Sequence, residues 1–250
     1  MSALLDLTEI EIAALVLITF TAGLVRGFSG FALSAMVMAS AVLILPPVEL
    51  IPICWWLEMS ASLLMARGGW RDADRGVVKG LVIGSALGLP LGLALTQAVS
   101  VEISALLALS LLIVLAASQL AKLRLPFLAT TPGLYGSGVL AGVATGIASI
   151  GGMVVALYVL ARDAPARQMR GSLVLFLFVS ALISLFTLLV FGVMDRQAAL
   201  RGMAFILPTM LGVLLGQRLF TPKYEPYYKP FCLSLLIGLA ALALIRTLLA

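Results

Sequence analysis

The chain has 250 residues, of which 62% are hydrophobic and 11% are charged, and its mean hydropathy is +1.18. A soluble domain is about 45–50% apolar and about 25% charged, so this composition argues against a water-soluble domain and against a disordered chain. The two cysteines, Cys54 and Cys232, lie far apart, which excludes a disulfide-rich secreted scaffold. A polytopic membrane protein remains, with helices of about 20 apolar residues each.

Residues and motifs that the sequence lacks exclude further classes of protein. The sequence contains no histidine, which removes His-based acid–base catalysis, His-ligated metals and haem held by His. It contains no GxxxxGK[ST] phosphate loop, so the chain is not itself an ATPase. The net charge of +5 reflects membrane topology rather than nucleic-acid binding, because Lys and Arg collect in cytoplasmic loops. We expect no cofactor.

Ten apolar segments follow one another in two sets of five. The first set covers roughly 10–26, 29–45, 48–66, 77–99 and 102–121, and the second covers roughly 134–147, 150–161, 170–192, 200–217 and 230–249. The first two members of each set are short and are joined through a glycine-rich break. Each such pair is either two tightly joined helices or a re-entrant hairpin, and the sequence leaves both options open.

Basic residues indicate which face is cytoplasmic. With the 67–79 loop inside, twelve of the sixteen basic residues fall on the inner face, three on the outer face, and Arg26 lies in a glycine-rich break. The twelve are Arg67, Arg71, Arg75, Lys79, Lys122, Arg124, Arg162, Arg167, Arg170, Arg218, Lys223 and Lys229, and the three are Arg196, Arg201 and Arg246. This excess predicts a multi-pass protein of the bacterial inner membrane with both termini on the external face.

The two halves resemble one another at an offset of 119 residues. The segment that begins Ala22-Gly23 aligns with the one that begins Ala141-Gly142, and each half holds an odd number of segments. The second half must then enter the membrane from the opposite face. The expected fold is an all-α polytopic membrane protein built from two inverted repeats, residues 1–125 and 126–250, as in secondary transporters.

The glycine-rich breaks at 26–30 and 145–152 suggest a ligand site. A helix break at membrane depth must face protein or a wet cavity, because unsatisfied backbone groups cost several kcal/mol in lipid. Exposed N–H groups at a helix start attract anions. The alternative is close helix packing through small residues, and this explains Gly76, Gly80, Gly84, Gly88 and Gly92 best.

Two motifs resemble those of a known family. Arg26-Gly-Phe-Ser-Gly-Phe31 is similar to the first-half signature of the TauE/SafE membrane transporters, also called the 4-toluene sulfonate uptake permease family. Gly142-Val-Ala-Thr-Gly-Ile-Ala-Ser-Ile-Gly-Gly152 is similar to the second-half glycine motif, and Glu58 and Gly88-Leu-Pro-Leu-Gly92 also fit. The resemblance implies a sulfite exporter-like protein that moves sulfite, sulfonates or other small organosulfur anions. Many relatives carry prolines after Gly151-Gly152, where this chain has Met153-Val154, so the substrate stays open.

Arg26 is the main candidate for substrate binding. A guanidinium at membrane depth is costly and offers a planar fork for oxyanions, although snorkelling to the interface is the alternative. We expect Arg26→Ala to abolish transport while the protein stays folded. The other predicted substrate-binding residues are Gly27, Ser29, Gly30, Gly146, Ser149, Gly151, Gly152 and Arg170. Local backbone capping is the alternative for the two serines, and inner-face charge is the alternative for Arg170.

Glu58 is the predicted coupling residue, because an intramembrane carboxylate indicates function. Two roles compete: Glu58 either pairs with Arg26 when the site is empty or carries a proton that is coupled to the anion. The expected partners are a small anionic substrate and the lipid bilayer, with proton coupling and a homodimer both compatible with the sequence.

Three other functions were weighed against a midplane, alternating-access transporter. Gly27-Phe-Ser29-Gly30 has the form found around intramembrane serine protease nucleophiles, but that chemistry needs a base and the chain has no histidine. An anion channel also suits facing breaks and a buried arginine. A non-transporting structural subunit explains the glycines but leaves Arg26 and Glu58 without a role.

Overall fold

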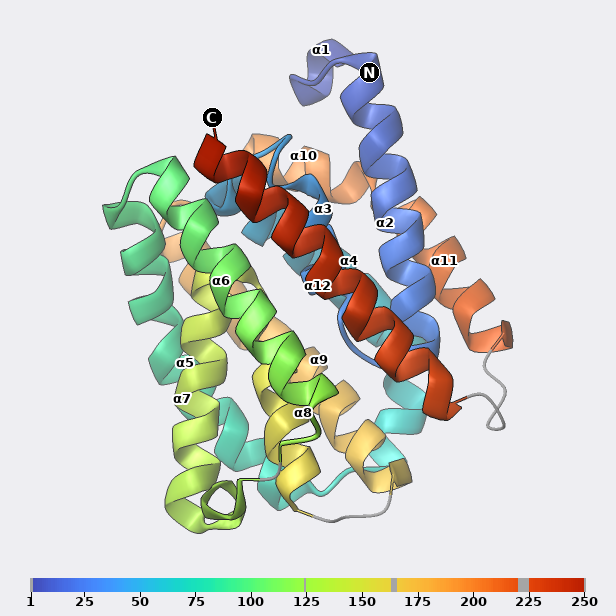
Figure 1. Cartoon of the computed structure of the whole chain (residues 1–250), viewed down its shortest axis with the longest axis vertical. Helices are drawn as coiled ribbons and strands as arrows, with labels where there is room; N and C mark the ends of the chain where they lie inside the picture. The colour runs from blue at the N-terminus through green and yellow to red at the C-terminus, as the bar shows by residue number, and fades with distance from the viewer. Residues whose placement is uncertain (1, 124, 163–165, 220–224, 250) are drawn as a thin grey trace.

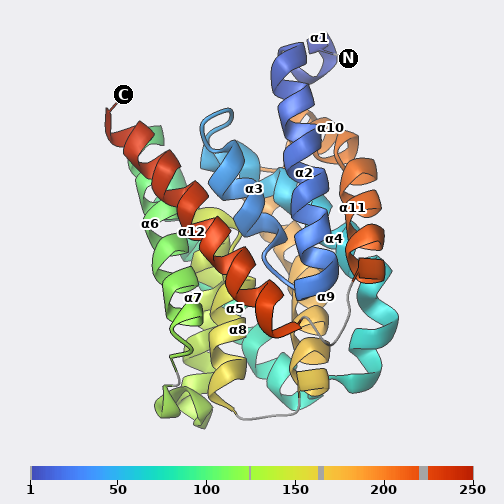
Figure 2. The same cartoon turned by 45° about the vertical axis from the view of Figure 1, so that its right-hand side comes forward.

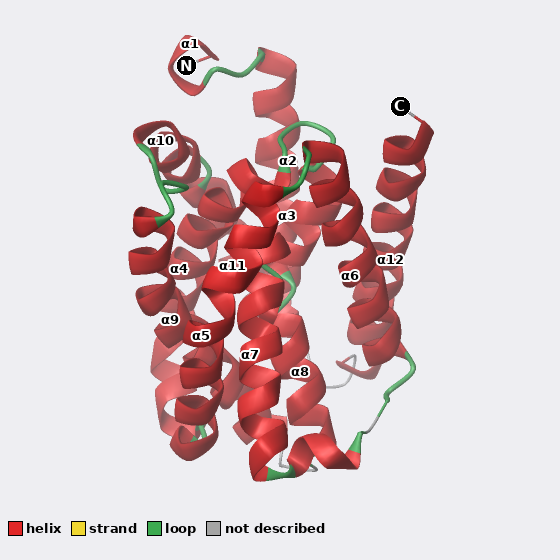
Figure 3. Cartoon of the chain, turned by 90° about the vertical axis from the view of Figure 1, so that its left-hand side faces the viewer, coloured by secondary structure: helices red, strands yellow, loops and turns green. Residues whose placement is uncertain are grey.

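The computed structural model describes residues 2–123, 125–162, 166–219 and 225–249, and within these ranges the chain is helical and has no strand (Figure 3). The helices of the first half are α1 (Ser2–Leu5), α2 (Glu9–Ser29), α3 (Leu33–Ala41), α4 (Pro47–Asp72), α5 (Arg75–Ala98) and α6 (Val101–Leu120). Those of the second half are the 3₁₀ helix η1 (Pro126–Ala129), α7 (Thr131–Ala148), α8 (Gly151–Ala161), α9 (Ala166–Val190), α10 (Arg196–Ala204), α11 (Ile206–Leu219) and α12 (Glu225–Leu249). Arg124 and Lys223, both expected in inner loops, lie outside the described residues.

The all-α, multi-pass prediction is confirmed. Within the described ranges, seven helical stretches are long and apolar enough to cross a membrane. Every predicted segment corresponds to a helix except that at 200–217, which is divided into α10 and α11 at Phe205. Pro208 explains the division, because it has no N–H to donate back to the preceding turn.

Several helices begin at a polar N-cap residue whose side chain accepts a hydrogen bond from a backbone N–H of the first turn. These residues are Thr8, Asp74, Ser100, Thr130 and Asp195. Each cap satisfies one of the N–H groups that a helix start leaves without a partner. Short polar residues in the connections therefore set where the long apolar helices begin.

The two short pairs are hairpins that turn back inside the bundle. In Figures 1 and 2 the pair α2 and α3 starts and ends at one end of the bundle, and the pair α7 and α8 starts and ends at the other. With 9 and 11 residues, α3 and α8 are about 14 and 17 Å long, far short of a hydrocarbon core of about 30 Å. Both breaks, near Gly30 and Ser149, thus lie within the bundle.

Glycines allow two pairs of helices to approach each other closely. The backbone of α2 contacts that of α11 through Gly23, Gly27, Gly212 and Gly216. In the same way α5 contacts α7 through Gly80, Gly84, Gly88, Gly92, Gly138, Gly142 and Gly146. A Cβ atom at Gly88 would overlap the carbonyl oxygen of Val139, so helix packing accounts for Gly80, Gly84, Gly88 and Gly92, as the sequence indicated. Gly76 differs, because a Cβ there would meet only Asp74 Oδ1, at 3.4 Å.

The helix contacts follow the same pattern in both halves. The third segments, α4 and α9, pack on each other at the centre, and the fifth segments, α6 and α12, also pack on each other. The first segment of each half packs on the fourth of the other, α2 on α11 and α7 on α5. The third segment likewise contacts the fourth of the other half, α4 with α10 and α11, and α9 with α5. Exchanging the halves therefore maps these contacts onto one another.

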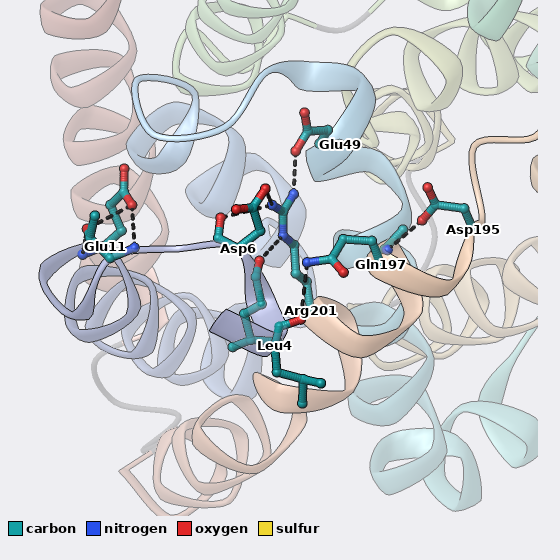
Figure 4. A network of polar contacts seen from close by, with 10 residues as sticks. Leu4, Asp6, Glu11, Glu49, Asp195, Gln197 and Arg201 are labelled. Carbon is teal, nitrogen blue, oxygen red and sulfur yellow. Dashed lines mark hydrogen bonds and ion pairs between the residues drawn. The ribbon is translucent and has the colours of Figure 1, made fainter. Parts of the chain in front are cut away.

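A buried arginine joins three segments at the end of the bundle that holds both termini (Figures 3 and 4). Arg201 of α10 donates from Nε to the carbonyl oxygen of Leu5 at 2.7 Å and from Nη2 to that of Asp6 at 3.2 Å. Its Nη1 pairs with the carboxylate of Glu49 at the start of α4. Arg201, which the sequence indicated only as an outer charge, thus fixes the N-terminal segment and α10 against α4.

Candidate functional site

A cavity of about 50 Å³ lies between α4, α5, α9 and the second broken pair, α7 and α8; we call it the central cavity. This volume has room for a few water molecules or a small solute. Its apolar walls include Trp55, Leu89 and Phe176. Its polar lining consists of Glu58 and hydroxyl groups from four helix positions and one break, namely Ser85, Thr145, Ser180, Ser184 and Ser149.

The two breaks meet beside this cavity. A smaller space of about 10 Å³ is lined by Ala32 and Ser34 from the first break and by Ser149 and Ile150 from the second. Glu58 lines both spaces, so one carboxylate lies where the interrupted segments approach each other. Segments that are more than 100 residues apart in sequence thus form one polar centre within an apolar bundle.

In the first break, a protein carboxylate occupies the start of α3. Gly30 has a left-handed φ of 81° and Ala32 a φ of 72°, and the N-cap position Ala32 has no side chain able to accept a hydrogen bond. Glu58 of α4 supplies the acceptor instead: its Oε1 accepts from the Ser34 N–H at 3.3 Å and from the Ser34 hydroxyl at 2.9 Å. Negative charge is favoured at a helix N-terminus, so Glu58 caps α3.

Arg26 is fully buried and holds the first break against α4. Its Nη1 donates to the carbonyl oxygen of Gly30, and its Nη2 donates to Ser62 Oγ at 3.2 Å. Nη2 also lies 3.4 Å from Glu58 Oε2, which is the pairing considered from the sequence. Arg26 is not among the residues that line the central cavity. In this conformation it therefore contacts the cavity only through Glu58.

In the second break, no side chain caps the start of α8. Ser149 ends α7 with a left-handed φ of 58°, and the N-cap residue Ile150 makes no side-chain hydrogen bond. Within the described part of the chain, no acceptor receives the N–H groups of Gly151 and Gly152, both of which line the central cavity. The residue 119 positions after Glu58 is Leu177, and it cannot replace a carboxylate. The start of α8 thus presents bare amides to the cavity, which favours an anion.

Three further predicted site residues, Gly27, Ser29 and Gly146, have local structural roles in this conformation. Gly27 and Gly146 lie at the crossings with α11 and α5, where a Cβ would meet backbone atoms. Ser29 Oγ donates to the Phe31 carbonyl oxygen at 2.6 Å and accepts from its N–H at 3.2 Å, which is the local capping considered above. The side chain of Arg170 lies outside the described part of the structure.

Sequence reasoning missed the hydroxyl groups of α9. Ser180 and Ser184 line the central cavity one helical turn apart. Phe176 and Leu188, four residues before and after this pair, also line it. Ser180 Oγ is buried and has no hydrogen-bond partner among the described residues. Polar residues repeating every four positions in a strongly apolar helix were the available signal, because that spacing places side chains on one face.

The arrangement suits reversible binding of a small oxyanion. Amide and hydroxyl groups supply donors on the α8 and α9 side, and Glu58, which pairs with Arg26, lines the cavity from α4. No group of three or more His, Cys, Asp or Glu residues that could hold a metal occurs in the described ranges. The two cysteines are free and buried, and their positions indicate no redox role.

Comparisons with known proteins place the chain in a family. No curated protein and no solved structure matched it. The sequence profile described as Sulfite exporter TauE/SafE matches residues 15–243, which include both breaks and every residue named at the central cavity. The chain therefore belongs to the TauE/SafE sulfite exporter family of membrane transporters.

Proposed function

We propose that the protein is a secondary transporter that moves a small sulfur oxyanion, sulfite or an organosulfonate, across the bacterial inner membrane. The observation that carries this proposal is the uncapped start of α8, which faces a cavity lined by hydroxyl groups. The family membership supports sulfur compounds as the substrate class. An oxyanion would accept hydrogen bonds from Gly151, Gly152, Ser149 and Ser180, and Arg170 would attract it from the cytoplasm.

The proposed mechanism is alternating access between two inverted repeats, residues 1–125 and 126–250. The exchange of contacts between the halves and the hairpins at opposite ends of the bundle support this arrangement. The excess of basic residues at the end opposite the termini supports a cytoplasmic position for that end, and an external position for both termini.

Transport by purified protein in liposomes tests the function. The panel is sulfite, sulfate, thiosulfate and methanesulfonate, each with and without a pH gradient, and protein-free liposomes are the control. We expect saturable uptake of at least one sulfur oxyanion and accelerated uptake of labelled anion when unlabelled anion is trapped inside. A channel would conduct without such counterflow. Absence of flux for the whole panel would favour a structural subunit.

We expect Glu58→Gln to abolish the response of flux to a pH gradient. The proposed role of Glu58 is to release Arg26 and the start of α3 when it takes up a proton, since a neutral carboxyl group is a weaker partner for both. Glutamine keeps the size of the side chain but cannot titrate. The measurement compares initial uptake at several gradients, with Glu9→Gln, at an exposed position outside the cavity, as the matched variant. If flux by Glu58→Gln responded to the pH gradient as wild-type flux does, Glu58 would not be the coupling residue.

A further inference from the structure

A second cavity, of about 60 Å³, lies at the end of the bundle opposite the two termini. The start of α5, the end of α8 and the start of α9 enclose it; we call it the inner cavity. Its polar lining comprises Asp74, Tyr158, Arg162, Gln168 and Ser172. None of these residues belongs to the central cavity, so the inner cavity is a separate site.

Hydrogen-bond donors outnumber acceptors in the inner cavity. Arg162 Nη1 lies 3.5 Å from the Tyr158 hydroxyl and 3.7 Å from Asp74 Oδ2. Ser172 Oγ accepts from the Asp74 N–H at 2.9 Å, which leaves the Ser172 hydroxyl hydrogen available. Tyr158 and Ser172 are buried and line the cavity. Together with the guanidinium, they form a site suited to an oxyanion.

The only carboxylate that lines this cavity among the described residues is already engaged. Asp74 Oδ1 accepts from the Val77 N–H at 3.1 Å, where it caps α5, and Oδ2 faces Arg162. The ion pair is about one third exposed on both sides, and exposed pairs of this kind contribute little to stability. An entering anion can therefore take the guanidinium from Asp74 at little cost, while Asp74 keeps its role as the cap of α5.

The two cavities lie along one face of α9. Gln168 and Ser172 line the inner cavity, and the next residues at the same spacing, Phe176 and Ser180, line the central cavity. Four residues of helix rise about 6 Å, so one turn separates the two linings on α9. On α5, Val77 lines the inner cavity and Ser85 the central one.

Buried apolar residues occupy the helix positions between the linings of the two cavities. Leu81 lies midway between Val77 and Ser85 on α5, and Val155 lies between the parts of α8 that line the two spaces. Phe176 lines the central cavity one turn after Ser172 on α9, and all three of these apolar residues are at most 1% exposed. Solute passing between the cavities along these helices must displace these side chains.

We propose that the inner cavity is a second oxyanion site, at which the transported anion binds before or after it crosses the layer of Leu81, Val155 and Phe176. This inference rests on the proposed transport function and adds to it the route and a second binding site. Arg162 provides the charge, and Tyr158, Gln168 and Ser172 provide further donors.

The inner site is tested by measuring the transport kinetics of Arg162→Gln with sulfite offered at one face of the membrane at a time. A hydrogen bond to a charged group contributes about 1.5–3 kcal/mol, and each 1.4 kcal/mol corresponds to a tenfold change in affinity. Because Arg162 is partly exposed, we expect an effect at the lower end of this range. That corresponds to an increase of about tenfold in the sulfite concentration that gives half-maximal transport. This increase should appear only when sulfite is offered at the face that carries Arg162. Inside-out and right-side-out membrane vesicles separate the two faces.

Two further variants make the result specific. Lys79→Gln removes a positive charge from an exposed position of α5 at the same end of the bundle, and we expect wild-type kinetics from it. Arg162→Lys keeps the charge without the planar fork and should give an intermediate value. Gel filtration and circular dichroism verify that each variant is folded.

The possible failures are distinguishable. If the wild-type protein transports sulfite but Arg162→Gln behaves like Lys79→Gln, or shifts both faces equally, the inner site is wrong and the proposed function stands. If the wild-type protein moves no anion of the panel, the proposed function fails, and the inner site fails with it.

Discussion

Arg26→Ala is expected to abolish transport and to lower the free energy of unfolding by about 3–5 kcal/mol, the usual cost of removing one partner from a buried ion pair. The substitution would leave Glu58 buried without its cation and the Gly30 carbonyl oxygen without its donor. The sequence predicts that Arg26→Ala stays folded, and these contacts add that the folded variant is less stable than the wild-type protein. Thermal unfolding can be followed with a thiol-reactive dye, because Cys54 and Cys232 are buried in the folded protein.

The double variant Arg26→Met/Glu58→Gln separates stability from function. Replacing both members of a buried pair by neutral side chains of similar size is often neutral or stabilising. We therefore expect the double variant to regain most of the lost stability and still to lack transport. Full flux in either variant would contradict a transport role for Arg26. A double variant as unstable as Arg26→Ala would show that Arg26 stabilises the break mainly through Gly30 and Ser62 rather than through Glu58.

Gly142→Ala should destabilise the protein by about 1–3 kcal/mol, the usual cost of an overpacked interior. A Cβ at this position would overlap the Ser85 carbonyl oxygen and lie 2.7 Å from the Leu89 backbone nitrogen. Because both neighbours are backbone atoms, α5 and α7 would have to move apart. Ser85 and Leu89 also line the central cavity, so we expect a clear loss of transport as well.

Gly136→Ala is the matched control on the same helix. A Cβ at Gly136 meets nothing within 4 Å, so the added methyl group should leave packing unchanged. We expect wild-type transport and equal or slightly higher stability, since alanine is the better helix former. Unfolding temperatures and initial uptake rates of both variants check the pair. Equal behaviour of Gly136→Ala and Gly142→Ala would contradict close packing of α5 on α7.

The two halves use their breaks differently. In the first half, Glu58 of α4 caps the N-terminus of α3 and also pairs with Arg26 of α2. In the second half, Thr145 and Leu177 occupy the positions 119 residues after Arg26 and Glu58, and the N-terminus of α8 stays uncapped. The backbones of the two breaks differ as well: Gly30 and Ala32 are left-handed in the first, and only Ser149 is left-handed in the second. The first break is thus filled by the protein's own carboxylate, and we propose that the second binds the solute.

The all-α, multi-pass architecture, most segment bounds and the paired breaks could be predicted from the sequence alone. Long apolar runs, glycine-rich interruptions and polar N-caps are local signals, and the bilayer allows few backbone solutions for them. The sequence also indicated Arg26 and Glu58, because charged residues stand out among apolar neighbours.

Which residues line the central cavity could be seen only once the packing of the helices was known. Ser180 and Ser184 look like ordinary helix residues until α9 packs beside the second break, and Gly27 and Gly146 look like ligand-binding glycines until their crossings with α11 and α5 are known. The physical reason is that cavity lining depends on the rotation of each helix and on contacts between distant segments. Those contacts decide whether a backbone amide is capped by a carboxylate, pressed against another helix or left facing the cavity.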